Sequence, residues 1–208
     1  MKFLFLSLLI LAQASYAKAE NRVLIVLNDA FQPTEYFEPR KAFEAEGFLI
    51  KTASRFGTEA HAGRKNTDVR PVTVDYSYEQ IEVEKFDAIV FVGGGGAWSD
   101  FFPDKALHSV LVKAMNRKGM TVGLICAGTG LLAMAKNLDG KTPQFSGRKV
   151  TGYGDVEALL TQVGKLDFSS GDLTKPHVVI DGNLVTGRDP MSAELFGKTM
   201  TNKILGKD

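Results

Sequence analysis

Continuous apolar runs that alternate with segments of helical periodicity constrain this 208-residue sequence more than any other feature. The runs at 22–27, 88–92 and 121–125 are almost entirely apolar instead of alternating with polar residues. A strand has this pattern when helices cover both faces of its sheet, as they do in parallel sheets. The sequence therefore predicts an α/β fold, in which helices sandwich a doubly wound, mostly parallel sheet of the flavodoxin-like kind.

The remaining elements follow from shorter patterns. Further strands are expected at 48–53, 72–74, 149–151, 178–180 and 184–186. Helices are expected at 34–46, 104–117, 156–163 and from 189 to about 205. The last two strands flank Asp181-Gly182-Asn183, which is typical of a hairpin turn.

Cys126 is the only cysteine of the chain, and it lies between the apolar run at 121–125 and a glycine-punctuated apolar segment at 127–135. A strand, a sharp turn and a helix in this order make a nucleophile elbow, which exposes the turn residue at the carboxyl edge of the sheet. A helix N-terminus favours the thiolate, so we expect Cys126 to have a low pKa. The alternative is an inert cysteine that packs as a small apolar side chain in the core.

Residues 1–19 have the features of a secretory signal peptide. A lysine precedes an apolar run at 3–11, and a small-x-small cleavage site follows at 15–17 or 17–19. We therefore expect an exported protein, periplasmic or secreted, with a single domain over 20–208. The alternative is an N-terminal anchor that is retained, although the apolar run is short for a membrane span.

Composition excludes several classes of partner. The formal net charge is +1, which gives no electrostatic reason to bind nucleic acid or, after signal removal, a membrane surface. A single cysteine cannot form an internal disulfide. There is no zinc-type Cys/His spacing and no phosphate-binding loop, so we expect no metal and no cofactor.

A glycine run follows the strand at 88–92, at the same sheet edge as Cys126. Gly94 and Gly95 have no side chain to block the approach of a substrate. The backbone N–H groups of Gly94 and Ala127 are expected to form an oxyanion hole. The alternative is that the glycines only turn the chain. Trp98 is expected either in the wall of the pocket or in the core.

Glu35 follows the first strand and lies near the start of a helix, where an acid is ordinarily a surface residue that complements the helix dipole. Together with this segment, three other stretches give the chain a resemblance to the ThiJ/PfpI superfamily, with its class 1 glutamine amidotransferase-like fold. These stretches are Gly93-Gly94, 123–128 and 181–190, and the resemblance runs from residue 22 almost to the C-terminus.

The resemblance implies roles for three residues and an assembly. The residue that matches Cys126 in this superfamily is a reactive thiol, and the one that matches Glu35 is a carboxylic acid held protonated against it. Tyr153 stands where the deglycase branch has a histidine that faces the thiol, so we expect it to donate a hydrogen bond to substrate. The alternative is that Tyr153 is a packed aromatic side chain. A homodimer is also implied.

The sequence departs from other branches of the superfamily. Ala127 and Gly95 stand where many relatives have histidine, so the chain lacks the Cys-His pair that activates a peptidase thiol. His61, His108 and His177 are weak candidates for that role. Arg188 matches an arginine near the site or the dimer contact, and the alternative is a structural ion pair.

The resemblance implies cofactor-free chemistry of the glyoxalase or deglycase type on small reactive carbonyl compounds. One alternative is an oxidative-stress sensor or protective protein, in which Cys126 is oxidised to a sulfinate held by Glu35. A cysteine peptidase or amidase is a third hypothesis, which the absence of a histidine after Cys126 disfavours.

Overall fold

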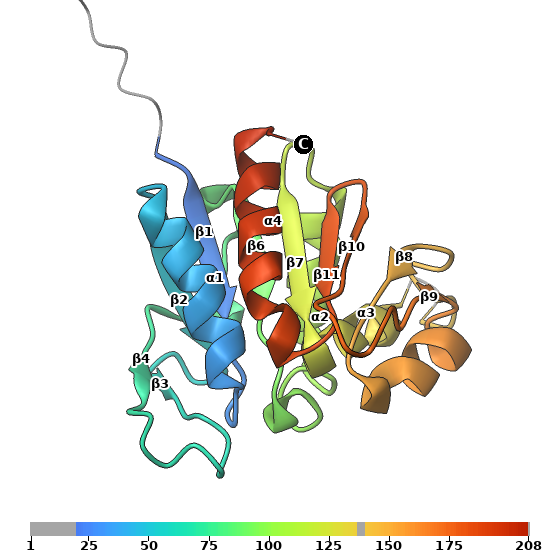
Figure 1. Ribbon diagram of the computed structural model, residues 1–208, viewed down its shortest axis with the longest axis horizontal. Coiled ribbons are helices and arrows are strands. Elements are labelled where there is room, and N and C mark those ends of the chain that lie inside the picture. The colour runs from blue at the N-terminus through green and yellow to red at the C-terminus, as the bar shows by residue number, and fades with distance from the viewer. Residues whose placement is uncertain (1–19, 137–139, 208) are drawn as a thin grey trace, which may run out of the picture.

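The computed structural model describes residues 20–136 and 140–207, and its central element is a seven-stranded sheet. Its strands are β1 (Arg22–Val26), β2 (Leu49–Ser54), β5 (Tyr76–Ser77), β6 (Ala88–Phe91), β7 (Thr121–Ile125), β10 (Val178–Asp181) and β11 (Leu184–Gly187). Their order is β10-β11-β7-β6-β1-β2-β5 (Figure 1). Only β10 runs antiparallel to its neighbour, so the predicted mostly parallel sheet is confirmed.

Helices cover both faces of this sheet (Figure 1). The helices α1 (Pro33–Ala45) and α4 (Ala193–Leu205) lie side by side on one face, and α2 (Lys105–Asn116) and α3 (Leu131–Met134) lie on the other. A Cβ on Gly197 would lie 2.7 Å from the Cα of Pro39, so glycine lets α4 approach α1 closely. Strands β6 and β7 are buried along their whole length, as their apolar sequences predict.

Short elements differ most from the sequence-based expectations. The expected strand at 72–74 is β4 (Val72–Thr73), which pairs with β3 (Glu59–Ala60) outside the main sheet. Likewise β8 (Lys149–Val150) pairs with β9 (Asp167–Phe168) instead of joining that sheet. Strands of two residues are too short to carry a hydrophobic period, so the sequence cannot assign them to a sheet.

Several short helical segments complete the fold, and the helix expected at 156–163 is confirmed as part of a continuous helical stretch over 154–163. The segments are η1 (Tyr78–Gln80), η2 (Val83–Lys85), η3 (Gly95–Ala97), η4 (Cys126–Gly130), η5 (Gly154–Val156), η6 (Leu159–Val163) and η7 (Pro190–Ser192). The predicted signal peptide, 1–19, falls outside the described residues. Within the part of the chain that the structure describes, no helix has the length and apolarity needed to cross a membrane.

The carboxyl ends of three adjacent parallel strands bring the candidate residues together. Glu35 follows β1, Gly93 follows β6, and Cys126 follows β7. The buried side chain of Asn28 links the carboxyl ends of β1 and β6. Its Nδ2 donates to the carbonyl of Val92 at 2.9 Å and to that of Gly93 at 3.1 Å. The candidate site is therefore built at the sheet edge where α/β folds bind ligands.

Candidate active site

Cys126 occupies the turn between β7 and η4. Its φ is +58°, a left-handed conformation that costs a residue with a side chain about 1–2 kcal/mol. Two contacts hold the turn: the hydroxyl of Thr129 donates to the Cys126 carbonyl at 2.7 Å, and Gly128 lies against the carbonyl of Phe91. The predicted strand–turn–helix geometry around the cysteine is confirmed, and its strained conformation is the one expected of a nucleophile elbow.

Glu35 is fully buried, so its interpretation as a surface residue is wrong. It lies in the first turn of α1, which Gln32 caps by accepting a hydrogen bond from the N–H of Thr34 at 3.2 Å. Burial raises the pKa of Glu35 from 4.5 to about 8, although the Cys126 thiol and the Gly93 N–H lower it in part. Glu35 therefore carries a proton at neutral pH.

Neither carboxyl oxygen of Glu35 has a hydrogen-bond partner among the described residues. The Cys126 thiol and the N–H of Gly93 are close enough to affect its pKa, but they do not reach the geometry of a full hydrogen bond. Burying an unpaired carboxyl group is costly, and such groups need an explanation. A carboxyl group aimed at a thiol, with both oxygens unpaired, is suited to exchange protons with a bound molecule.

The predicted low pKa of Cys126 is not what the structure gives. The side chain is only 7% exposed, and this burial raises the pKa of the thiol above its ordinary value. The charge of Glu35, when ionised, raises it further, whereas the N–H of Ala127 lowers it. Burial is the largest cause of the shift, and it outweighs the favourable position of Cys126 at the start of η4, which continues directly into α3.

Gly93 is a functional residue that the candidate set omits. A Cβ at this position would lie 2.6 Å from Oε2 of Glu35 and 2.7 Å from Cβ of Cys126. Only glycine therefore lets the carboxyl group and the thiol face each other across the end of β6. Two signals in the sequence point to it: it is the first glycine after a buried strand, and it belongs to a stretch that carries the family resemblance.

We expect Gly93→Ala to destabilise the protein by about 1–3 kcal/mol, because the added methyl group forces Glu35 and Cys126 apart. Gly95→Ala is the matched control: a Cβ there meets nothing within 4 Å, and the expected loss is about 0.5 kcal/mol or less. Denaturant unfolding of the two variants measures both values. Equal stabilities would show that Gly93 is not needed as a spacer.

The glycine run has a structural role in the backbone, in addition to the substrate-binding role predicted for it. Gly94 has a φ of +119°, and a Cβ there would lie 2.4 Å from the carbonyl of Ala30. The interpretation that it turns the chain is therefore correct, and it is compatible with a second role. The N–H of Ala127 already acts on the sulfur, and the pairing of Ala127 with Gly94 as an oxyanion hole stays a prediction.

Trp98 and Tyr153 are both exposed. Each residue is 49% accessible to solvent, so neither lies in the core, and the core position weighed for Trp98 is wrong. The indole Nε1 of Trp98 donates to Oδ2 of Asp155 at 3.4 Å. Tyr153 is the N-cap of η5, and its role toward substrate stays a prediction. Asp155 is a further residue that the candidate set omits.

The three histidines of the chain are engaged away from the thiol. Nδ1 of His61 lies 2.8 Å from a carboxyl oxygen of Asp29, and Nε2 of His108 lies 2.9 Å from a backbone carbonyl. Nε2 of His177 lies 3.2 Å from a serine hydroxyl. No imidazole is therefore placed to take a proton from Cys126, as the departure at Ala127 predicts.

Arg188 is a structural residue. It is 3% exposed, and its Nε donates to Oδ2 of Asp189 at 2.8 Å. Its remaining donors reach the backbone carbonyls of Ser170, Asp172 and Lys175 at 2.6–3.0 Å. With its guanidinium buried and held by these four hydrogen bonds, the arginine is the structural ion pair weighed above.

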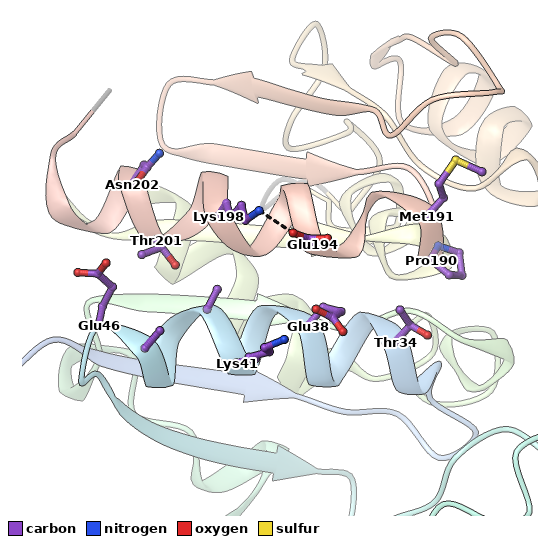
Figure 2. A pocket seen from close by; sticks show the side chains of 12 residues that line it. Thr34, Glu38, Lys41, Glu46, Pro190, Met191, Glu194, Lys198, Thr201 and Asn202 are labelled. Carbon is purple, nitrogen blue, oxygen red and sulfur yellow. Dashed lines mark hydrogen bonds and ion pairs between the residues drawn. The ribbon is translucent and has the colours of Figure 1, made fainter.

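A groove of about 850 Å³ lies between α1 and α4, and Figure 2 shows its polar walls. Lys198 pairs there with Glu194 at 2.5 Å. Its lining includes neither Cys126 nor Glu35 and consists of Thr34, Glu38, Lys41, Ala42, Ala45, Glu46, Pro190, Met191, Glu194, Lys198, Thr201 and Asn202. The groove is thus separate from the elbow, although it shares helix α1 with it.

Comparisons with known proteins agree with this geometry. The sequence profile of the DJ-1/PfpI family matches residues 21–203. General stress protein 18 of Bacillus subtilis is 30% identical over 85% of this chain and 94% of its own length. A protein named as a deglycase, from Pyrococcus abyssi, is 30% identical over 81% of this chain and 90% of its own.

Comparison with solved structures points to the same family. The crystal structure of a ThiJ/PfpI domain protein from Brachyspira murdochii superposes with a TM-score of 0.76 at 26% identity. That superposition covers 91% of this chain and 98% of the other. Together with the match of the family profile, this confirms the resemblance on which the candidate residues were chosen, and the chain belongs to the DJ-1/PfpI family.

Proposed function

We propose that this protein converts small reactive carbonyl compounds without a cofactor, by chemistry of the glyoxalase or deglycase type. The observation that carries the proposal is the buried carboxyl group of Glu35, which has two unpaired oxygens and faces the only thiol of the chain. The naming of one relative as a deglycase supports the same class of chemistry.

The reaction starts when the pair of Cys126 and Glu35 loses one of its two protons to solvent. That proton comes from Glu35, the more acidic of the two groups, and its carboxylate takes the thiol proton as the sulfur attacks, while the N–H of Ala127 stabilises the developing thiolate. The sulfur attacks the aldehyde carbon of methylglyoxal, a C–S bond forms, and the π electrons of the carbonyl pass to oxygen. The N–H groups of Gly94 and Ala127 hold that oxyanion until Glu35 protonates it, which gives a hemithioacetal.

Glu35, now a carboxylate, removes the proton from the former aldehyde carbon and returns it to the neighbouring carbon. The intermediate between these two transfers is an enediol, and its collapse leaves a thioester on Cys126. Water hydrolyses the thioester to lactate and the free thiol. The net change is addition of one water molecule to methylglyoxal, with no external oxidant or reductant.

The test is lactate formation by residues 20–208 in buffer that contains methylglyoxal and no added thiol. Enzymatic assay of lactate is expected to show turnover that stops once iodoacetamide has alkylated Cys126. In deuterated water, the second carbon of the product is expected to carry deuterium where Glu35 exchanges its proton with solvent. Absence of lactate, or turnover that survives alkylation, contradicts the proposal.

A second candidate function is a peroxide sensor. The pairing of a thiol with a carboxyl group that has two free oxygens favours it, because a protonated carboxyl group can donate to a sulfinate. Two molecules of peroxide would convert the thiolate to a sulfinate and release two of water. Mass spectrometry after graded peroxide separates the functions: a sensor gains two oxygen atoms on Cys126 before any methionine is oxidised.

Export and assembly complete the proposal. The N-terminal segment supports cleavage before Lys18 or Glu20 and a periplasmic or secreted product, which N-terminal sequencing of the mature protein tests. Membership of the family supports a homodimer, which light scattering of the mature protein tests. Neither property is needed for the chemistry at Cys126.

A further inference from the structure

Three short turns surround Cys126 and determine what reaches it. The turn η4 begins at Cys126 and contacts both η3 and η5. The side chain of Trp98, directly after η3, hydrogen-bonds to Asp155 of η5 at 3.4 Å, so the two outer turns are joined beside the elbow. Cys126 is only 7% exposed, and the Trp98–Asp155 hydrogen bond joins the two turns that contact its own turn.

Packing fixes the position of this bridge. The ring of Trp98 lies edge-on to the ring of Phe102 with centroids 5.0 Å apart. Phe102 in turn lies against Gly130 of η4, where a Cβ would be 2.4 Å from its ring. On the other side, Gly152 lies against Thr129, whose hydroxyl holds the Cys126 carbonyl. The segments that carry Trp98 and Asp155 therefore both pack against η4, the turn that carries the thiol.

At neutral pH Glu35 is protonated, so Asp155 is the charged acid that acts on the thiol. Asp155 is exposed, and among the described residues its hydrogen-bond partner is neutral Trp98 and not a lysine or arginine. Glu35 is the other acid that faces the sulfur, and Asp189 acts on Glu35. Arg188, the arginine in this region, uses its donors within the fold. A carboxylate substrate that reached the elbow would thus meet the negative charge of Asp155.

We infer that Asp155, held by Trp98 over the elbow, is a specificity-determining residue that selects neutral or positively charged carbonyl compounds and excludes anionic ones. The inference rests on the proposed function for its substrate class, which is aldehydes and their adducts with amines as opposed to α-oxo acids or phosphorylated carbonyls. The electrostatic selection itself does not depend on turnover.

The test compares two methanethiosulfonate reagents of similar size, one with a trimethylammonium group and one with a sulfonate group. Each forms a disulfide with Cys126 and releases methanesulfinate, and the mass of the intact protein reports the rate. The ratio of the cationic to the anionic rate cancels any change in the thiolate fraction. Asp155→Asn keeps the acceptor for Trp98 and removes only the charge.

The expected result is that Asp155→Asn lowers this ratio about fivefold at low salt, and that high salt lowers the wild-type ratio toward that of the variant. Asp68→Asn, which removes an exposed charge between β3 and β4, is the matched control and is expected to leave the ratio unchanged. Equal ratios for wild type and Asp155→Asn, or a thiol that reacts with neither reagent, overturn the inference.

The two proposals fail separately. A protein that forms no lactate but shows the fall in the ratio keeps the electrostatic selection and loses the carbonyl chemistry. A protein that forms lactate with equal ratios keeps the chemistry and loses the role of Asp155.

Discussion

Cys126→Ser is expected to reduce the conversion of methylglyoxal to lactate about a thousandfold or more, to the background of the solution reaction. A serine hydroxyl has the same place in the elbow, but it ionises far less readily than a thiol. Glu35 is too weak a base to remove that proton, and the adduct on oxygen does not lead to a thioester. Lactate formation under saturating methylglyoxal measures the loss.

The variant is expected to fold, because serine and cysteine have nearly the same volume and the strained φ of +58° is unchanged. A thermal unfolding midpoint close to that of the wild type is the control that separates lost chemistry from lost structure. Activity that remains within a few-fold of the wild type in a folded Cys126→Ser protein excludes the covalent mechanism.

Glu35→Gln is expected to slow turnover about a hundredfold to ten-thousandfold, the usual contribution of a general acid–base residue. Glutamine fills the same buried space and can donate a hydrogen bond, but it cannot move a proton between carbon and oxygen. The deuterium found in the product of the wild type is expected to disappear with the activity. Steady-state kinetics of lactate formation give the size of the effect.

The matched control is Glu38→Gln, the same chemical change one turn further along α1 at a half-buried residue that lines the groove away from the elbow. It is expected to keep its activity. If both variants lose activity alike, the effect belongs to helix α1 and its packing, and Glu35 has no special role in moving protons.

Much of the architecture could be predicted because its cause is local in the sequence. The run at 22–27 has apolar residues for both faces of a strand, and it becomes β1. Cys126 is recognisable because its turn needs small residues on both sides. By contrast, β5 consists of Tyr76 and Ser77 at the edge of the sheet, and two residues cannot show a period.

The electrostatics of the site were less predictable because they depend on residues far apart in the chain. Glu35 has the sequence context of a surface acid, and it is buried because Gly93 leaves room beside Cys126. The family resemblance implied its protonation, whereas the helix position alone implied the opposite. The predicted direction of the Cys126 pKa shift was wrong because burial of the thiol outweighs its position at the start of a helical segment.

The central claim is that Glu35 and Cys126 titrate as one coupled pair, in which the carboxyl group keeps its proton at neutral pH. The structure determines whether Glu35 raises or lowers the pKa of the thiol at a given pH. Below about pH 8, Glu35 is neutral and adds no charge beside the sulfur. Above that pH it ionises, and its negative charge raises the pKa of the thiol. Glu35→Gln removes this charge at every pH.

The most direct measurement is therefore the rate of alkylation of Cys126 by iodoacetamide from pH 5 to pH 10 in wild type and in Glu35→Gln. We expect wild type and Glu35→Gln to be alkylated at similar rates below pH 7. Above pH 8 the variant is expected to react increasingly faster than the wild type, with a lower pH midpoint. This faster alkylation is expected even though the variant converts methylglyoxal more slowly. Superimposable profiles, or a higher midpoint in Glu35→Gln, would contradict the coupling between the two groups.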